Sequence, residues 1–136
     1  MRDVVLKLSV LLCFGLALLG AQAQTLGLAS DLSNESQAGK ALVVSREGQC
    51  TLCHRIPDHA GAMGDLGPSL GGVATRLSAQ AIEARVKDSR SVNPHTIMPP
   101  YFSTVGLSHV DPKFKDQTLL TQAQLQQILA YLATLK

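Results

Sequence analysis

The sequence predicts an all-α domain in which short helices and long loops surround a central apolar group, and three observations support this class. Leu125, Ile128, Leu129 and Leu132 follow the helical i, i+3, i+4, i+7 pattern, and no segment shows the alternation of a strand. Residues 48–72 contain six of the eleven glycines, and residues 91–120 contain four of the six prolines, which is loop composition. Loops of this length cannot build a core alone, so we expect a large apolar cofactor at the centre.

The first helix of the domain is predicted from residue spacing, and the start of the last helix from a capping pattern. The first covers about residues 35–45, where Gly39 and Leu42 share one side. The last follows Thr121, which is separated by three positions from Gln124, as a capping box requires.

A middle helix is predicted to begin after Ser78, a suitable N-cap, and to run to about Asp88. Ile82 and Val86 are four positions apart, so they are expected to face the core together.

The amino-terminal segment has the layout of a secretory signal peptide. Arg2 and Lys7 precede an almost wholly apolar run over residues 8–19, and Ala21-Gln22-Ala23 supplies small residues for cleavage. The run is shorter than the roughly 20 apolar residues that span a bilayer. We therefore expect residues 1–23 to be cleaved and the protein to reach the periplasm.

Cleavage after Ala23 leaves 113 of the 136 residues, enough for one small domain. We expect a flexible lead-in over residues 24–34, one domain over residues 35–136, and no later membrane span. Removal of Arg2, Lys7 and Asp3 lowers the net charge from +2 to +1, which gives no electrostatic basis for binding nucleic acid.

The mature chain keeps two cysteines, because Cys13 leaves with the signal peptide. Cys50 and Cys53 are followed by His54, which gives C-x-x-C-H, the attachment motif of c-type haem. Two thiols three positions apart lie on one side of a helical turn, where they can bond the two vinyl groups of one haem edge. His54 would then be the proximal iron ligand.

A disulfide, a redox pair and a zinc site each fit the two cysteines less well than haem does. A disulfide would close a loop too short to stabilise a fold much. A thioredoxin-like redox pair would need a βαβ setting. A zinc site would need about four ligands, and no second ligand pair with zinc-like spacing is present.

Five side chains are candidates for the second axial ligand: His59, Met63, His95, Met98 and His109. We favour Met98, because Pro99 and Pro100 stiffen its loop and a thioether ligand raises the redox potential, as suits electron transfer. His95 is the second choice.

Gly67 and Pro68 are expected to form the proximal support of the site. A backbone carbonyl in this turn can accept the Nδ1–H of His54 and so fix the ring. An ordinary turn is the alternative.

These features together resemble the class I cytochrome c fold. In that fold the first and last helices cross at a small glycine beside an aromatic residue, roles that Gly39 and Tyr131 match. The other matching features are Cys50-x-x-Cys53-His54, Gly67-Pro68-x-Leu70 and Met98-Pro99.

Longer stretches resemble the SoxX family, the small monohaem subunit of SoxAX cytochromes. The most specific is Asn93-Pro94-His95-Thr96-Ile97-Met98-Pro99-Pro100-Tyr101. The others are residues 39–43 with 48–50, Gly106-Leu107 with Val110, and residues 120–121 and 131–135 at the two ends of the last helix. The chain departs from the family at His109, where a basic residue is favoured, and at Asp116-Gln117-Thr118, where a Gly-Lys-Pro-like turn is favoured.

The SoxX resemblance implies one covalent haem c with His54 and Met98 as axial ligands. It also implies periplasmic sulfur oxidation with a SoxA-like partner, in a haem-dependent L-cysteine S-thiosulfotransferase that joins thiosulfate to a cysteine of a SoxYZ-like carrier. The partner's cysteine-ligated haem carries out that chemistry, so this chain has no catalytic residue of its own. Its electrons would pass to a downstream small cytochrome c or similar acceptor.

Two other functions remain open. One is a free-standing periplasmic cytochrome that shuttles electrons in another respiratory pathway. The other is a haem sensor or peroxidase, which needs an open iron position and is disfavoured by Met98.

Overall fold

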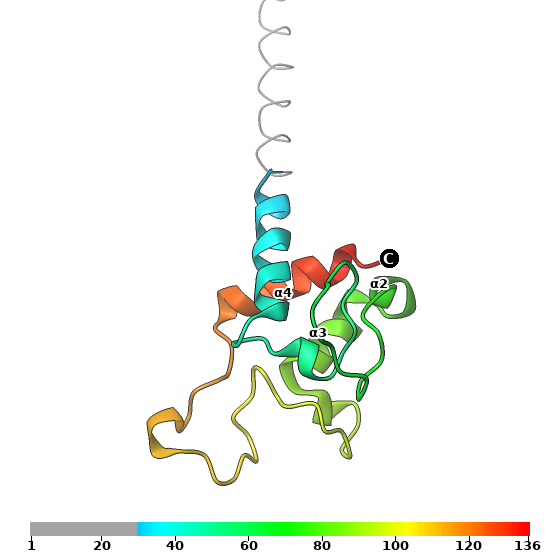
Figure 1. The fold of residues 1–136 in the computed structure, drawn as a ribbon. Helices are drawn as coiled ribbons and strands as arrows, with labels where there is room; N and C mark the ends of the chain where they lie inside the picture. The colour runs from blue at the N-terminus through cyan, green and yellow to red at the C-terminus, as the bar shows by residue number, and fades with distance from the viewer. Residues whose placement is uncertain (1–29) are drawn as a thin grey trace, which may run out of the picture. The chain divides into compact units, whose positions relative to one another are not determined.

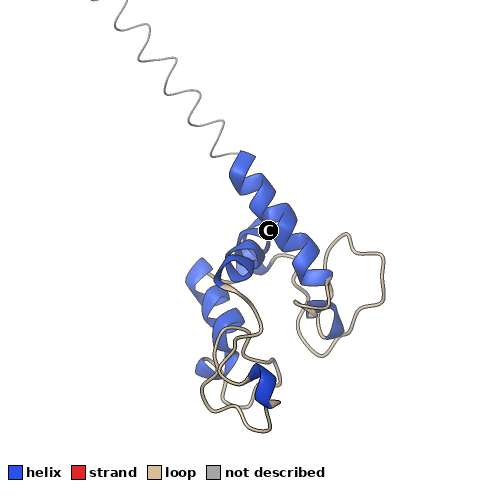
Figure 2. Cartoon of the chain, turned by 90° about the vertical axis from the view of Figure 1, so that its left-hand side faces the viewer, coloured by secondary structure: helices blue, strands red, loops and turns tan. Residues whose placement is uncertain are grey.

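The structure, a computed structural model, describes residues 30–136, and one compact unit covers residues 35–136. The described residues form helices and loops without a strand (Figure 2), which confirms the all-α class. The elements after the amino-terminal helix are η1 (Cys50–Leu52), α2 (Val73–Arg76), α3 (Ala79–Asp88), η2 (Ser89–Ser91), η3 (Pro112–Phe114) and α4 (Gln122–Thr134). The expected signal peptide, Cys13 and residues 24–29 lie outside the described residues.

The amino-terminal helix is helical over residues 30–44 of the described chain and, in residues 35–44, packs against α4 (Figure 1). A β-carbon on Gly39 would overlap the backbone carbonyl of Gln127 and lie 3.0 Å from Cβ of Tyr131. The expected crossing of Gly39 beside Tyr131 is therefore confirmed, since only a residue without a side chain admits this approach.

Residues 30–34 are helical and exposed, although we expected them in a flexible lead-in. The segment contains neither glycine nor proline, so nothing in its backbone chemistry stops a helix there.

The helices α3 and α4 begin as the sequence predicts. The Ser78 hydroxyl accepts a hydrogen bond from Ala81 N at 3.2 Å. Gln124 N donates to the Thr121 hydroxyl at 3.2 Å, and Thr121 N donates to the Gln124 side chain at 2.9 Å, which completes the capping box. Both helices contact each other and α2, and their buried side chains are Ile82, Val86, Leu125, Ile128, Tyr131 and Leu132.

The short helix α2 was not predicted, because four residues are too few to show a helical period. Tertiary contacts hold it in place. Ala74 N donates to the carbonyl of Leu135 at 3.0 Å, and Arg76 donates to the carbonyls of Ser69 and Gly71 at 2.7 and 2.6 Å.

A long segment between Tyr101 and Leu120 makes a wide excursion from the helices, yellow to orange in Figure 1. Residues 105–119 are all exposed, and η3 is the one helical turn among them. Within residues 30–136 no helix is both long and apolar enough to cross a membrane.

Candidate cofactor site

A cavity of about 450 Å³ lies at the centre of the compact unit, a size within the usual range of small-molecule and cofactor sites. Seven of the eleven buried apolar side chains of the described core line it: Val73, Ile82, Val86, Tyr101, Leu120, Ile128 and Leu132. The core is therefore built around this space, as the loop-rich sequence predicts for a domain with a large apolar cofactor.

The two cysteines of the motif reach the cavity from the 3₁₀ turn η1. Cys53 N and His54 N both donate to the carbonyl of Cys50, at 3.2 and 2.8 Å. In a 3₁₀ turn side chains three positions apart are eclipsed, so Cys50 and Cys53 are presented on one side. Both are free thiols that line the cavity.

The His54 ring is held by the following loop. Its Nδ1 lies 2.7 Å from the carbonyl oxygen of Pro68, which makes Nδ1–H the donor and leaves Nε2 with a free lone pair. A β-carbon on Gly67 would overlap the ring and lie 2.6 Å from Nδ1. Gly67 thus leaves room for the imidazole, and the carbonyl of Pro68 fixes its tautomer.

Met98 reaches the same cavity from the loop after η2, 44 positions beyond His54. It is partly buried against the core. The structure therefore brings Cys50, Cys53, His54, Gly67, Pro68 and Met98 together in the lining of one cavity.

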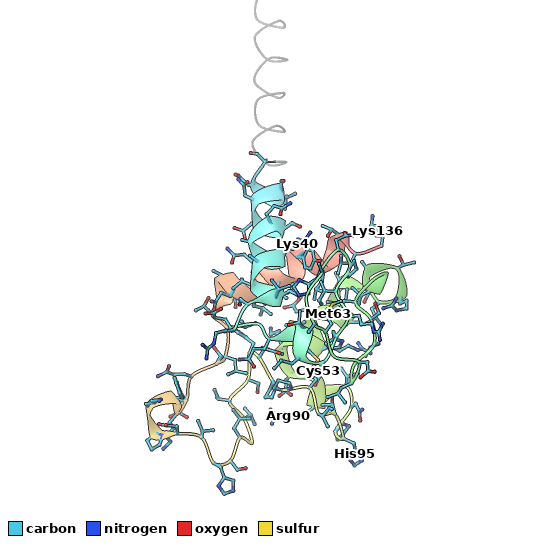
Figure 3. The ribbon with its side chains drawn as sticks, viewed as in Figure 1. Lys40, Cys53, Met63, Arg90, His95 and Lys136 are labelled. Carbon is cyan, nitrogen blue, oxygen red and sulfur yellow. The ribbon has the colours of Figure 1, made fainter. Side chains whose placement is uncertain are left out.

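The other four candidate ligands are not among the cavity-lining residues. The sulfur of Met63 accepts a hydrogen bond from Ile56 N at 3.0 Å. His95 lies at the far tip of its loop, well separated from Cys53 in Figure 3, and His109 is exposed at a backbone φ of 58°. His59 is packed beside Gly61.

The burial of Cys50 disfavours dithiol redox chemistry. Burial raises the pKa of Cys50 to about 11, whereas a reactive cysteine needs a lowered pKa to form thiolate. Burial also raises the pKa of Tyr101, so that this phenol in the lining stays neutral. Among residues 30–136 no group of three or more His, Cys, Asp or Glu side chains could share a metal ion, so a zinc site has no ligand set there.

Three polar residues of the site escaped the sequence analysis. Ser89 and Thr96 hydrogen-bond to the backbone of Met98. Arg85 is the only lysine or arginine among the residues lining the cavity. Thr96 belongs to the Asn93–Tyr101 block, but no sequence pattern assigns a role to any of the three, because each acts through a contact that α3 and its following loop create only when folded.

The donor set fits a covalently attached haem. The thiols of Cys50 and Cys53 lie on one turn and form no disulfide, and the oriented imidazole of His54 follows them. The thioether of Met98 enters the same apolar space from a separate loop. These are the groups needed for two thioether bonds and two axial iron ligands.

Comparisons with known proteins agree with this chemistry. The family model for cytochrome c matches residues 36–136. The fold matches a chain in the crystal structure of SoxXA from P. pantotrophus with a TM-score of 0.64 and 23% sequence identity, over 74% of this chain and 80% of that chain. No curated protein sequence matches the chain.

Proposed function

This chain belongs to the cytochrome c family, and from that premise we propose that it is a monohaem, SoxX-like electron-transfer subunit of a thiosulfate-oxidising heterodimer. The observation that carries the proposal is the convergence of Cys50, Cys53, His54 and Met98 on one apolar cavity. A single C-x-x-C-H motif in the sequence limits the number of attached haems to one.

The residues divide the work of holding the haem. Cys50 and Cys53 would form the thioether bonds, and His54 and Met98 would be the axial ligands. Arg85 would place its positive charge beside the haem carboxylates. A bound haem would supply reversible one-electron transfer, and a thioether ligand would raise its potential.

The rim of the cavity suits electron passage to another protein. Leu66 and Ile97 line the cavity and are 70% and 74% exposed, so they lie at its opening. Apolar side chains at an opening let a partner approach without stripping water from charged groups. We infer that electrons enter or leave at this rim.

The SoxX-like role rests on the Asn93–Tyr101 block and on the likeness of the fold to a chain of SoxXA. In the proposed reaction a thiol of a SoxYZ-like carrier and thiosulfate form a sulfur–sulfur bond, and one proton and two electrons are released. A SoxA-like partner carries out this step, since Cys50 and Cys53 are consumed as thioethers. The present chain receives the electrons one at a time and passes them to a downstream small cytochrome c or similar acceptor.

We place this reaction in the periplasm because the first 23 residues have the layout of a cleaved signal peptide. Mass spectrometry of the protein from cells that mature c-type cytochromes should show the 113-residue chain plus one haem. A mass that corresponds to residues 1–136 with free thiols would contradict both the export and the attachment.

The functional test is reconstitution. Reduction of an electron acceptor by thiosulfate and a SoxYZ-like carrier is measured with this chain alone, with a SoxA-like partner alone and with both. We expect turnover only with both. Full turnover by the partner alone would reject the subunit role and favour a free-standing electron shuttle.

A further inference from the structure

Ser89 is a buried polar residue next to the cavity, and its hydroxyl faces the Met98 loop. The residue is 5% exposed and begins η2 directly after α3. Its Oγ lies 3.0 Å from the carbonyl oxygen of Met98 and 3.3 Å from the hydroxyl of Thr96. A buried hydroxyl in an apolar core is costly unless its hydrogen bonds are made. The two contacts to Met98 and Thr96 meet this requirement.

The hydrogen bonds of Ser89 and Thr96 form a closed ring with the backbone of Met98. Met98 N donates to the Thr96 hydroxyl at 3.2 Å. Each hydroxyl has one proton, so the arrangement that satisfies all three contacts has Thr96 donating to Ser89 and Ser89 donating to the Met98 carbonyl. Both polar backbone groups of Met98 are thus bound by two side chains.

The two residues after Met98 contribute no hydrogen-bond donor to the loop. Pro99 and Pro100 have no N–H, and Pro99 also restricts Met98 to extended backbone conformations. The start of the loop is tied down, because Asn93 N donates to the carbonyl of Ser89 at 2.9 Å and Thr96 N donates to that of Asn93 at 3.1 Å. The two hydroxyls therefore add hydrogen bonds to both backbone groups of Met98 itself, which help to orient its Cα–Cβ bond.

We propose that Ser89 and Thr96 are positioning residues, which hold the Met98 thioether towards the haem iron and slow its release. This inference rests on the proposed function, since it requires a haem with Met98 as an axial ligand. It also gives a role to Thr96, which stands three positions after Asn93 in the Asn93–Tyr101 block.

The experiment measures how fast cyanide replaces Met98 on the ferric haem of the full holoprotein. Thr96→Val keeps the shape of the side chain and removes the hydroxyl, and Ser89→Ala removes the other member of the ring. Loss of a buried hydrogen bond that leaves its partner unsatisfied has a free-energy cost equivalent to roughly a tenfold change in a rate or equilibrium constant. We expect both variants to bind cyanide about tenfold faster than the original protein.

Matched variants separate the hydroxyls from packing. Thr96→Ser restores the hydroxyl without the methyl group and should return the rate close to the original. Ser91→Ala removes a hydroxyl two positions from Ser89, one that donates to the carbonyl of Asp88 at 2.7 Å and does not line the cavity. It should leave the cyanide rate unchanged.

Failure of the inference can be told apart from failure of the proposed function. Ferric His/Met haem has a weak absorption band at about 695 nm. If Met98→Ala keeps the band, or if the original protein lacks it, Met98 is not the ligand and the proposed site is wrong. If the band depends on Met98 but cyanide binds at the same rate in Thr96→Val and Ser89→Ala, the positioning role alone is rejected. A fast rate in Thr96→Ser would also reject it, because packing would then be the cause.

Discussion

Gly67 and the ring of His54 are in such close contact that no other side chain fits between them. The β-carbon of Gly67→Ala would overlap the imidazole, and the ring would have to turn away from the carbonyl of Pro68. Loss of this hydrogen bond frees the tautomer and orientation of the ligand. We expect Gly67→Ala to lower the yield of holoprotein and to alter its haem absorption spectrum.

Gly71→Ala is the control for the His54 contact. It makes the same change on the same loop, where the nearest atom, Cγ of Pro57, would be 3.3 Å from the new carbon. We expect holoprotein with an unchanged spectrum. Equal spectra for both variants would show that the ring of His54 does not depend on Gly67.

At the scale of single residues, the sequence identifies the residues whose own side chains bind the cofactor. Cys50, Cys53 and His54 are recognisable because their spacing is fixed by the cofactor they bind. Ser89 is not, because its hydroxyl acts on a residue nine positions away, and a serine after a helix has many uses. Met98 could be ranked first from its prolines, but only the folded loop shows that the competing side chains lie elsewhere.

At the scale of elements, the crossing between the helix of residues 30–44 and α4 depends on Gly39. The side chain of Gly39→Val would overlap the backbone of Gln127, which has no freedom to move within α4. Overpacking of this kind costs about 1–3 kcal/mol. For a domain of this size each kcal/mol lowers the Tm by about 4–8 °C. Thermal unfolding of the holoprotein measures the change.

Ala41→Val controls for the lower helix propensity of a β-branched residue, since residue 41 is exposed on the same helix. Its Tm should fall by much less than that of Gly39→Val. If the two variants melt at the same temperature, the helices do not meet at Gly39.

A charged pair at the end of α3 contacts the long segment after Tyr101. Arg90 binds Asp88 through two hydrogen bonds of 2.7 and 2.6 Å and also donates to the carbonyl of Val105 at 2.8 Å. Hydrogen bonding to Arg90 lowers the pKa of Asp88 to about 2, from an ordinary value of 3.8. A lowered pKa means that the pair stabilises the fold above about pH 3.8, and that this contribution disappears as the pH falls towards 2.

We expect the pKa of Asp88 to rise towards its ordinary value in Arg90→Gln, as measured by NMR titration of the carboxyl group. Lys113→Gln, which removes the same charge on the long segment itself, should leave the titration of Asp88 unchanged. A titration of Asp88 that is the same in Arg90→Gln as in the original protein would show that the pair does not form in solution.

The elements with a clear period were predictable, and those fixed by distant contacts were not. The capped helices α3 and α4 follow from Ser78 and Thr121, whose side chains act within one turn. The helix α2 depends on Leu135 at the far end of the chain. Asp116 adopts a φ of 61°, a backbone conformation that its residue type does not predict.

At the scale of the whole molecule, most of the hydrophobic core lines the cavity. Most of the buried apolar side chains face the cavity and so would have no partner there without a bound group. The sequence predicts this arrangement indirectly, because its glycine- and proline-rich loops are long and its helices are short. What it cannot supply is the full list of core residues, since Ile56, Tyr101 and Leu120 come from segments without a helical period.

The last prediction is that the chain depends on its haem for a cooperative fold. A cavity of about 450 Å³ left empty would cost on the order of 10 kcal/mol, an upper bound because the loops can collapse into it. This cost is comparable with the 5–15 kcal/mol that stabilises a typical domain. The double variant Cys50→Ala/Cys53→Ala cannot bond haem, and its haem-free form should lose most of the cooperative thermal transition followed by circular dichroism. Cys53→Ala alone keeps one thioether bond and should retain the transition, so a haem-free double variant that melts as cooperatively as the holoprotein would contradict a core built on the cofactor.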